Sequence, residues 1–216
     1  MKNNIISKEE LCNALAAKIG RERFEKFQNA RVAICGAGGL GSNVAIALAR
    51  SGVGHLHIID FDKVEATNLN RQQYKVSQIG MNKVDALREN LREIMPFCDV
   101  TTDCVRIEEG NVCELFDGDT IICEAFDGAK DKAMLVNAVL EKMPDKYLVA
   151  ASGMAGMDSA NNIRTKEIGR RFYLCGDFVS DVEKADGLVA PRVMLCAMHE
   201  AQAVLRIIDW DNKEGN

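Results

Sequence analysis

The sequence predicts an α/β fold in which a mostly parallel β-sheet is covered by helices on both faces. Short apolar segments that suit buried strands alternate with amphipathic segments that suit helices, and this alternation is typical of parallel sheets. A glycine-rich segment separates the first of these strands from the helix that follows it. The length of 216 residues fits one domain, which buries roughly 70% of the surface that the unfolded chain exposes.

The first 29 residues are expected to be helical. Ser7 and Glu10 have the S-x-x-E spacing of a capping box, which marks the start of a helix. Apolar residues then recur at helical spacing until Gly20, which ends the run. Phe24 and Phe27 continue the apolar face, so a second helical stretch is expected before the first strand.

Five strands and then two weaker ones are expected after this segment. The stronger patterns cover 31–35, 55–60, 100–107, 120–125 and 147–151, and the weaker ones cover 162–168 and 171–174. The expected helices cover 42–50, 82–95, 112–116, 130–142 and 191–210. We expect the late strands to be antiparallel additions at one edge of the sheet. No linker divides the chain, so we expect a single domain, 1–216, with an N-terminal segment 1–29, a core 30–155, and a crossover with a C-terminal helix, 156–216.

The composition excludes several classes of protein. Hydrophobic residues make up 47% of the chain and charged residues 27%, values that rule out a disordered, collagenous or wholly coiled-coil chain. The balance of 27 Lys and Arg against 32 Asp and Glu gives a formal net charge of −5. Since no basic block is present either, we expect no nucleic-acid partner. No apolar stretch approaches the roughly 20 residues that span a bilayer, so we expect no membrane association.

The eight cysteines are expected to be mostly free thiols in a reducing cytoplasm. No pair has the C-x-x-C spacing of a structural zinc site, so no zinc is predicted. The N-terminal segment lacks the apolar core of a signal peptide. Cys35, Cys123 and Cys196 lie inside apolar runs, where a thiol behaves as a small hydrophobe.

The segment GAGGLG, from Gly36 to Gly41, matches the G-x-G-x-x-G pattern of a Rossmann-like nucleotide site. An apolar strand precedes it and a helix follows it, which is the context that the pattern requires. The free N–H groups at the start of the helix suit a phosphate, and Asp60 after the second strand can accept hydrogen bonds from ribose hydroxyls. A tight turn without a ligand is the simpler alternative. Taken alone, the motif favours NAD, the commonest ligand of this pattern.

The residues after Asp60 differ from those expected of a dehydrogenase. Acids, amides and an arginine are packed into the loop, and Lys83 follows at the start of the next helix. Arg71 and Lys83 would add two cations beside the glycine loop, where backbone N–H groups already suffice for a dinucleotide diphosphate. Two extra cations suit a triphosphate from which pyrophosphate departs. Loop charges are usually solvated and inert, and this simpler interpretation fits Lys63 and Glu65.

These residues resemble the ThiF/MoeB/HesA family of ATP-dependent adenylyltransferases, which are related to the activating enzymes of ubiquitin. The resemblance rests on D-x-D-x-V-E-x-x-N-L-N-R-Q, which begins at Asp60 and comes after G-x-G-G-x-G-S, which begins at Gly36. It is strong over 30–155 and weaker to the end, where GLVAPRV precedes the last helix. The short length and the phrases AFDGAKDKAML and YLCGD are most similar to the small ThiF-type enzymes of thiamine biosynthesis.

The resemblance implies a reaction and its partners. A ubiquitin-like sulfur carrier protein similar to ThiS presents a C-terminal Gly carboxylate, which attacks the α-phosphate of ATP. The products are an acyl-adenylate and pyrophosphate, the reaction uses Mg²⁺, and the enzyme is a homodimer. No protein nucleophile is needed, because the attacking group belongs to the substrate and the enzyme supplies alignment and charge neutralisation.

The resemblance also implies roles for individual residues. Arg71, Lys83 and Asp127 are the implied catalytic residues: Arg71 contacts the phosphates, Lys83 neutralises the reacting phosphate and Asp127 holds Mg²⁺. Asn68 also contacts the phosphates, and Gln72 supports them. The full set implied for nucleotide binding is Gly36, Gly38, Gly39, Gly41, Asp60, Asp62, Asn68, Arg71, Gln72 and Lys83.

The chain departs from the family pattern in several places. Many relatives hold zinc with two C-x-x-C pairs, which are absent here. Relatives often place an N-terminal arginine at the nucleotide of a partner subunit; Arg21 or Arg23 could do so, or could lie on a solvated helix face. Cys175 could be a nucleophilic thiol, as in some relatives, or a structural thiol, which we favour. Lys132 stands where an arginine is common.

Three other functions stay open at this point. The first is adenylation of another carboxylate, on a molybdopterin-type carrier, a small molecule or an RNA. The second is an NAD-dependent oxidoreductase, which leaves Arg71 and Lys83 without a role. The third is a non-catalytic module that binds a carrier, against which the intact Asp60 and Asp127 argue.

Overall fold

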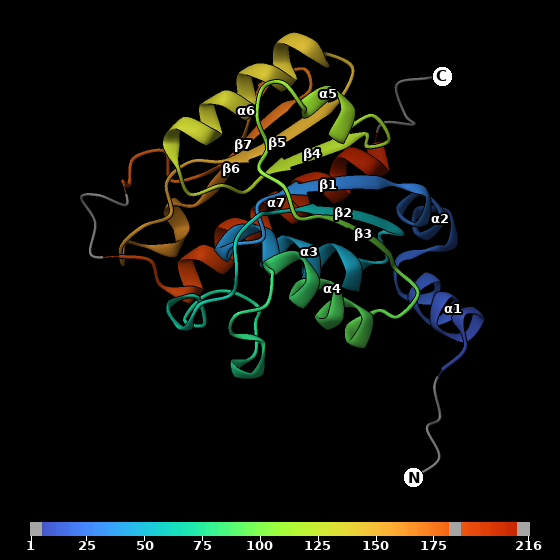
Figure 1. Cartoon of the computed structure of the whole chain (residues 1–216). Helices are drawn as coiled ribbons and strands as arrows, with labels where there is room; N and C mark the ends of the chain where they lie inside the picture. Colours follow the sequence, from blue (N-terminus) through green and yellow to red (C-terminus); the bar gives the residue numbers. More distant parts are fainter. Residues whose placement is uncertain (1–5, 182–186, 211–216) are drawn as a thin grey trace.

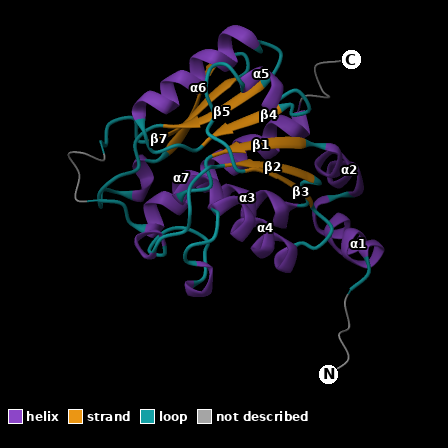
Figure 2. Ribbon diagram, viewed as in Figure 1, coloured by secondary structure: helices purple, strands orange, loops and turns teal. Residues whose placement is uncertain are grey.

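A seven-stranded sheet crosses the molecule, and helices cover both of its faces (Figures 1 and 2). The computed structural model describes residues 6–181 and 187–210. The strands are β1 (Arg31–Cys35), β2 (His55–Ile59), β3 (Asp99–Asp103), β4 (Ile121–Glu124), β5 (Tyr147–Ala151), β6 (Arg164–Gly169) and β7 (Phe172–Gly176). The α-helices are α1 (Lys8–Ile19), α2 (Arg21–Asn29), α3 (Gly39–Ser51), α4 (Lys83–Ile94), α5 (Val112–Leu115), α6 (Ala129–Lys142) and α7 (Ala190–Trp210). The predicted fold class is confirmed.

The strands are arranged in the order β3-β2-β1-β4-β5-β7-β6. Neighbours from β3 to β7 pair in parallel, and β6 pairs antiparallel with β7 at the edge. The expected antiparallel addition is therefore the β6–β7 pair, while β7 itself runs parallel to β5. Successive strands are added on one side of β1 up to β3 and on its other side from β4 onward. The boundary between β1 and β4 is therefore a topological switch point, where ligands bind in parallel sheets.

Alternate residues of each central strand pack into different cores, one on each face of the sheet. Val32 and Ile34 of β1 face a large core that they share with α3, α4 and α7. Ala33 and Cys35 face a smaller core, which includes Phe116 and residues of α6. Since both faces are buried, the strands are continuously apolar, as the sequence pattern requires.

The N-terminal helices lie at the end of the sheet where β1 begins (Figure 1). The capping box is present: the backbone N–H of Glu10 donates to Ser7 Oγ at 3.2 Å, and Ser7 N–H donates to the Glu10 carboxylate at 2.9 Å. Phe24 and Phe27 of α2 are buried, as expected. No helix within residues 6–181 and 187–210 is long and apolar enough to cross a membrane.

Helix α3 begins three residues earlier than the sequence pattern suggests, because glycines allow it to start directly at the end of β1. A Cβ atom on Gly41 would lie 1.8 Å from the Gly36 carbonyl oxygen, so only glycine permits this approach of helix to loop. Both the backbone N–H and the hydroxyl of Ser42 donate to the carbonyl of Gly38, at 3.1 and 2.6 Å. The close approach fixes the start of α3 against the first strand.

One carboxyl group, that of Glu200, is buried in the large core without a hydrogen-bond partner among the described residues. Glu200 lies in α7 and has no measurable exposure. Burial, and then the negative charge of Glu124, raise its pKa well above the usual value. The Lys132 ammonium acts in the opposite direction but is the weaker influence. Glu200 therefore keeps its proton to higher pH in the folded protein than in the unfolded chain.

We expect Gly41→Ala to lower the free energy of unfolding by about 1–3 kcal/mol or more, because the new methyl group overlaps the Gly36 carbonyl. The matched control is Gly110→Ala, where an added Cβ meets nothing within 4 Å. That change should alter the free energy of unfolding by less than about 0.5 kcal/mol. Urea unfolding measures both, and equal stabilities of the two variants would contradict the assigned packing role.

We also expect Glu200→Gln to remove a pH-dependent loss of stability. Above the ordinary carboxyl pKa of 4.5 the unfolded chain releases the Glu200 proton while the folded chain keeps it. The unfolded state then binds fewer protons, so wild-type stability falls as pH rises, by about 1.4 kcal/mol for each unit up to the folded pKa. Thermal unfolding from pH 5 to pH 8 should show a flatter dependence for Glu200→Gln than for Glu141→Gln, which alters an exposed carboxyl of α6. Parallel curves for the two variants would refute it.

Candidate functional site

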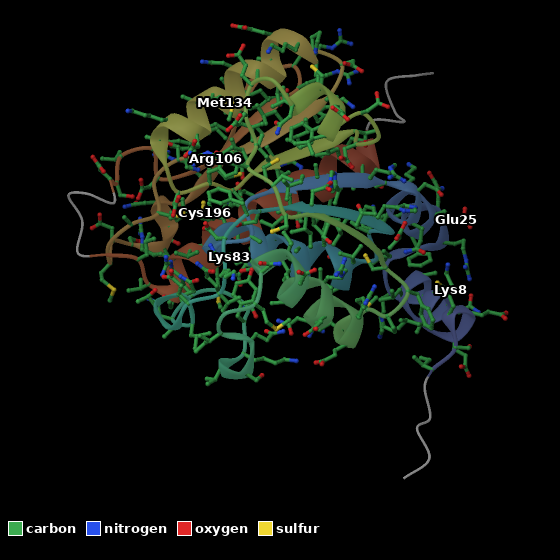
Figure 3. The ribbon with its side chains drawn as sticks, in the orientation of Figure 1. Lys8, Glu25, Lys83, Arg106, Met134 and Cys196 are labelled. Carbon is green, nitrogen blue, oxygen red and sulfur yellow. The ribbon has the colours of Figure 1, made fainter. Side chains whose placement is uncertain are left out.

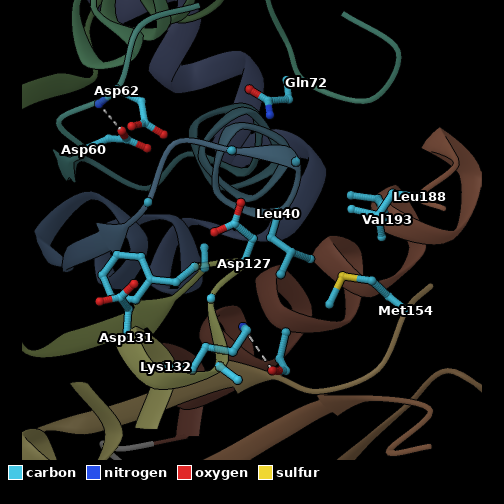
Figure 4. A pocket seen from close by; sticks show the side chains of 18 of the residues that line it. Leu40, Asp60, Asp62, Gln72, Asp127, Asp131, Lys132, Met154, Leu188 and Val193 are labelled. Atoms are coloured by element: carbon cyan, nitrogen blue, oxygen red, sulfur yellow. Dashed lines mark hydrogen bonds between the residues drawn. The ribbon is translucent and has the colours of Figure 1, made fainter. Parts of the chain in front are cut away.

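A cavity of about 660 Å³ opens at the carboxyl ends of the central strands, at the switch point between β1 and β4. Residues from the glycine loop, the loop after β2, the loop after β4 and the loop after β5 line it, together with the first turn of α7. Figure 4 shows Asp60, Gln72, Asp127 and Lys132 around this space. In Figure 3, Lys83 and Arg106 lie toward this end of the molecule, away from Lys8 and Glu25 in the N-terminal helices. The location is the one expected for a ligand site in such a sheet.

The glycine loop forms one wall of the cavity. Gly36, Gly38 and Gly39 line it. Gly36 has φ +98°, and a Cβ there would lie 2.9 Å from the Ala125 carbonyl oxygen, so the position requires glycine. Gly41 does not line the cavity. The contact that the structure records for Gly41 is its close packing against Gly36.

Asp60 ties this loop to the next one. Its carboxylate accepts a hydrogen bond from Ala37 N–H at 2.6 Å. It accepts another from Asp62 N–H at 2.7 Å, which Figure 4 shows. Burial raises the pKa of Asp60, and the positive charge of Lys83 acts against that rise. Asp60 thus stands at the cavity with its position set by two backbone groups.

Lys83 is buried at the start of α4 and lines the cavity. Its Nζ lies 2.8 Å from a carboxylate oxygen of Asp62, and its backbone N–H donates to the Asp62 carbonyl at 2.9 Å. The hydroxyl of Tyr74 donates to the Ala37 carbonyl at 2.6 Å, which joins this region to the glycine loop. A lysine so buried is costly without a counter-charge, and Asp62 supplies one.

Arg71 and Gln72 also reach the cavity. Arg71 is half-buried, and its guanidinium donates to the Asn70 side-chain oxygen at 2.7 Å. Gln72 is buried, and its Oε1 has no hydrogen-bond partner among the described residues. Asn68 is not a lining residue: its Oδ1 accepts from Glu65 N–H at 3.0 Å. The structure therefore places Asn68 in a turn beside the cavity.

Asp127 lies exposed on the loop between β4 and α6 and lines the cavity. Its carboxylate has no hydrogen-bond or ion-pair partner among the described residues. Those residues contain no group of three or more His, Cys, Asp or Glu side chains that could hold a metal by themselves. A single free carboxylate still fits Mg²⁺, which usually takes one or two carboxylates and completes its shell with phosphate and water.

Sequence reasoning missed a buried ion pair beneath the cavity. Glu124 has no measurable exposure, and Lys132 Nζ lies 3.0 and 2.9 Å from its two oxygens. Lys132 also donates to the Ala151 carbonyl at 3.2 Å, and Phe126 N–H donates to Glu124 at 2.7 Å. Glu124 therefore holds the strand end from which Asp127 projects. The only signal in the sequence is an acid inside the apolar run TIICEA.

A second missed feature lies at the opposite end of the cavity from α7. The guanidinium of Arg106 lies 5.3 Å from the centre of the Phe61 ring and 3.1 Å from an Asp131 carboxylate oxygen. Val105 and Ile107 beside it are also lining residues. This end offers apolar and planar surface next to Asp60, which is the surface that a nucleotide base requires.

Cys175 lies in strand β7 rather than in a loop, and it is buried. Burial, followed by the charge of Glu200, raises the pKa of its thiol to about 12. A reactive cysteine needs exposure and a lowered pKa, so this geometry fits the structural thiol. Arg21 and Arg23 do not line the cavity; Arg23 pairs with Asp209 at 3.1 Å, and Arg21 donates to the Asn13 side chain at 2.7 Å.

Comparison with known proteins gives several matches. The chain is 34% identical over 154 residues to tRNA threonylcarbamoyladenosine dehydratase of Bacillus subtilis, over 70% of this chain and 60% of that protein. It is 35% identical over 144 residues to adenylyltransferase and sulfurtransferase UBA4 of Eremothecium gossypii, over 65% of this chain and 32% of that protein. The matches thus span between about a third and three fifths of the length of these relatives.

The solved structures show the same fold. The structure of Escherichia coli tRNA N6-threonylcarbamoyladenosine dehydratase in complex with ATP superposes with a TM-score of 0.87 at 21% identity, covering 98% of this chain and 100% of that one. A structure of Escherichia coli MccB with MccA-N7isoASN has a TM-score of 0.67, covering 86% of this chain and 58% of that one. A model of the ThiF family matches residues 11–215. The chain therefore belongs to the ThiF family.

Proposed function

We propose that the chain is an ATP-dependent adenylyltransferase that converts a carboxylate to an acyl-adenylate and releases pyrophosphate. The observation that carries the proposal is the convergence of the glycine loop, Asp60, Arg71, Lys83 and Asp127 on one cavity. Two relatives support it: a structure of the same fold is named as a complex with ATP, and a curated relative is named an adenylyltransferase.

The residues present can divide the work of this reaction. Asp60 can bind the ribose, and the N–H groups of the glycine loop and the start of α3 can bind phosphates. Arg71 and Lys83 can neutralise the charge that develops as pyrophosphate departs. Asp127 can hold Mg²⁺, which supplies further positive charge to a triphosphate. Because the attacking oxygen belongs to the substrate, the site needs alignment and charge rather than a nucleophile.

The first candidate for the carboxylate is the C-terminal glycine of a ubiquitin-like sulfur carrier, similar to ThiS and acting in thiamine thiazole synthesis. The residue pattern from Asp60 to Gln72 and the similarity to UBA4 support it. The net charge of −5 also favours a protein tail over a polyanion. With this function we propose a homodimer in the cytoplasm.

The second candidate is an acid attached to tRNA. It is favoured by the 34% identity to a tRNA threonylcarbamoyladenosine dehydratase and by the match to the structure of a protein of that name over nearly the whole chain. The two candidates share the adenylation step and differ in what enters the cavity.

We expect exchange of labelled pyrophosphate into ATP only when the correct acceptor is present. Separate reactions contain ubiquitin-like carriers from the same organism or its bulk tRNA, and mass spectrometry then identifies the adenylated carboxylate. Exchange with a carrier supports the first candidate, and exchange with tRNA alone transfers the proposal to the second. No exchange with any acceptor, together with tight NAD binding, would reject an adenylyltransferase.

We expect Asp127→Asn to raise the Mg²⁺ concentration that gives half-maximal exchange by at least about tenfold, because it removes the free carboxylate of the site. High Mg²⁺ should restore part of the rate, and binding of ATP without Mg²⁺ should stay unchanged. Asp117→Asn, on an exposed turn outside the cavity, is the matched control. An unchanged Mg²⁺ dependence in the Asp127→Asn variant would show that Asp127 does not hold the metal.

A further inference from the structure

Two loops form the wall of the cavity that faces α7. The first follows β5 and the second follows β7, and we call them the paired loops, residues 152–156 and 176–180. Asp177 N–H donates to the Gly153 carbonyl at 2.9 Å, and Phe178 N–H donates to the Ser152 carbonyl at 3.0 Å. Ala155 N–H donates to the Ser180 hydroxyl at 3.0 Å. The two loops therefore behave as one unit.

Glycine makes this pairing possible. Gly153 has φ +83°, and a Cβ there would lie 2.1 Å from a carboxylate oxygen of Asp177. Gly176 has φ +144°, and a Cβ there would lie 1.9 Å from the Ser152 carbonyl oxygen. Side chains at either position would separate the loops.

A buried ion pair joins the paired loops to α7. Arg192, in the first turn of α7, is 4% exposed, and its Nη2 lies 2.5 Å from a carboxylate oxygen of Asp177. Its other donors bind the carbonyls of Asp158, Ser159 and Met154, at 2.6, 3.1 and 3.4 Å. The recorded partners of this guanidinium thus all lie in or beside the paired loops, and none lies in α3.

Asp177 organises the second loop in turn. Its Oδ1 accepts from Val179 N–H at 2.9 Å and from Ser180 N–H at 2.8 Å. Burial acts to raise its pKa, but the hydrogen bonds from Ser180 and Val179 and the charge of Arg192 outweigh burial, so the pKa lies below the usual value. Asp177 is therefore ionised, and the pair with Arg192 is a true ion pair.

The same turn of α7 also touches the glycine loop. Val193 follows Arg192, lines the cavity, and lies 2.9 Å from where a Cβ of Gly39 would stand. Figure 4 shows Met154, Leu188 and Val193 gathered at one end of the cavity, with Asp131 toward the other end. A nucleotide placed on Asp60 and the glycine loop leaves this apolar end for the second substrate.

We propose that Arg192 and Asp177 are positioning residues for the acceptor: they hold the paired loops at the distance from α7 at which the two enclose the entering carboxylate. This inference rests on the proposed adenylation. The pair acts on the acceptor end, so it governs acceptor binding, whereas ATP binding depends on the glycine loop and Asp60. Arginine suits this position because its guanidinium has several donors in one plane, which bond the carbonyl of Met154 in the first loop and the carboxylate of Asp177 in the second.

The test compares Arg192→Met, Arg192→Lys and Asp177→Asn with Arg88→Met. Arg88 also pairs with an aspartate, Asp85 at 2.7 Å, but its recorded partners, Asp85 and Thr102, lie in α4 and β3 and not in the paired loops. Hydrogen exchange should become at least about tenfold faster at the amides of Val179 and Ser180 in the Arg192→Met and Asp177→Asn variants, and stay unchanged in the glycine loop. Arg192→Lys should show an intermediate effect, because it keeps the charge and loses the fork.

Kinetics then separate positioning from general damage. With the carrier protein that supports exchange in the wild type, or with a short synthetic peptide ending in Gly-Gly, KM for the acceptor should rise at least about tenfold in Arg192→Met. KM for ATP should stay within about twofold, and Arg88→Met should match the wild type in both. Equal increases in the KM values for ATP and for the acceptor would show that the Arg192–Asp177 pair only stabilises the fold. Hydrogen exchange that becomes faster uniformly along the chain would show the same.

The proposal and the proposed function fail in different ways. Absence of acceptor-dependent exchange in the wild type rejects adenylation. If the wild type is active and the acceptor KM of all three variants is unchanged, adenylation stands and the positioning role is wrong. Should Arg192→Met not fold, Arg192→Lys and Asp177→Asn give the same comparison with smaller perturbation.

Discussion

The fold and the candidate site both depend on one close approach between two pieces of backbone. Gly41 at the start of α3 lies so near the Gly36 carbonyl that no side chain fits between them. This contact places the first N–H groups of α3 at the carboxyl end of β1, where the cavity opens. The neighbouring groups attach to the same point: Asp60 accepts the N–H of Ala37, and a side chain of α3 donates to the carbonyl of Arg71. A backbone contact in the core thereby sets the geometry of a polar site.

Helix α7 connects that site to the rest of the molecule. Its apolar face packs against α3 and the sheet, and this packing forms much of the large core. Two of its buried ionisable side chains, Arg192 and Glu200, differ in their surroundings. The guanidinium of Arg192, in the first turn, donates hydrogen bonds to the Asp158 carbonyl and to the Asp177 carboxylate. Glu200 lies in the core, and its carboxyl oxygens have no hydrogen-bond partner among the described residues. Polar contacts therefore anchor α7 beside the cavity, and the buried carboxyl group without a partner lies farther along the helix.

Most of the strands and helices and the glycine loop could be predicted from the sequence, because apolar runs and glycines depend directly on local structure. The errors have physical reasons. Strand β3 ends at Asp103 rather than near Ile107. Val105 and Ile107 line the cavity, and Ile107 also packs into the smaller core, but neither belongs to a strand. Asp60 and Asp127 lie in a recognisable sequence pattern, which is why both could be named as candidates, and both line the cavity. The pairs Arg192–Asp177 and Glu124–Lys132 were not found, since each joins different elements and only the folded chain brings their partners together.

Lys83, Lys132 and Arg106 at the cavity are already paired with carboxylates before any substrate arrives, whereas the recorded partners of Arg71 are neutral oxygens of Thr67 and Asn70. Lys83 lies 2.8 Å from Asp62, Lys132 lies 2.9 Å from Glu124, and Arg106 lies 3.1 Å from Asp131. An incoming polyphosphate thus enters a region with little excess charge and must compete with resident carboxylates for these groups. Binding becomes an exchange of partners within the protein, in which a carboxylate set free can take up a cation that accompanies the phosphates. Such a site discriminates by local charge density and not by overall attraction, which suits a chain whose own net charge is negative.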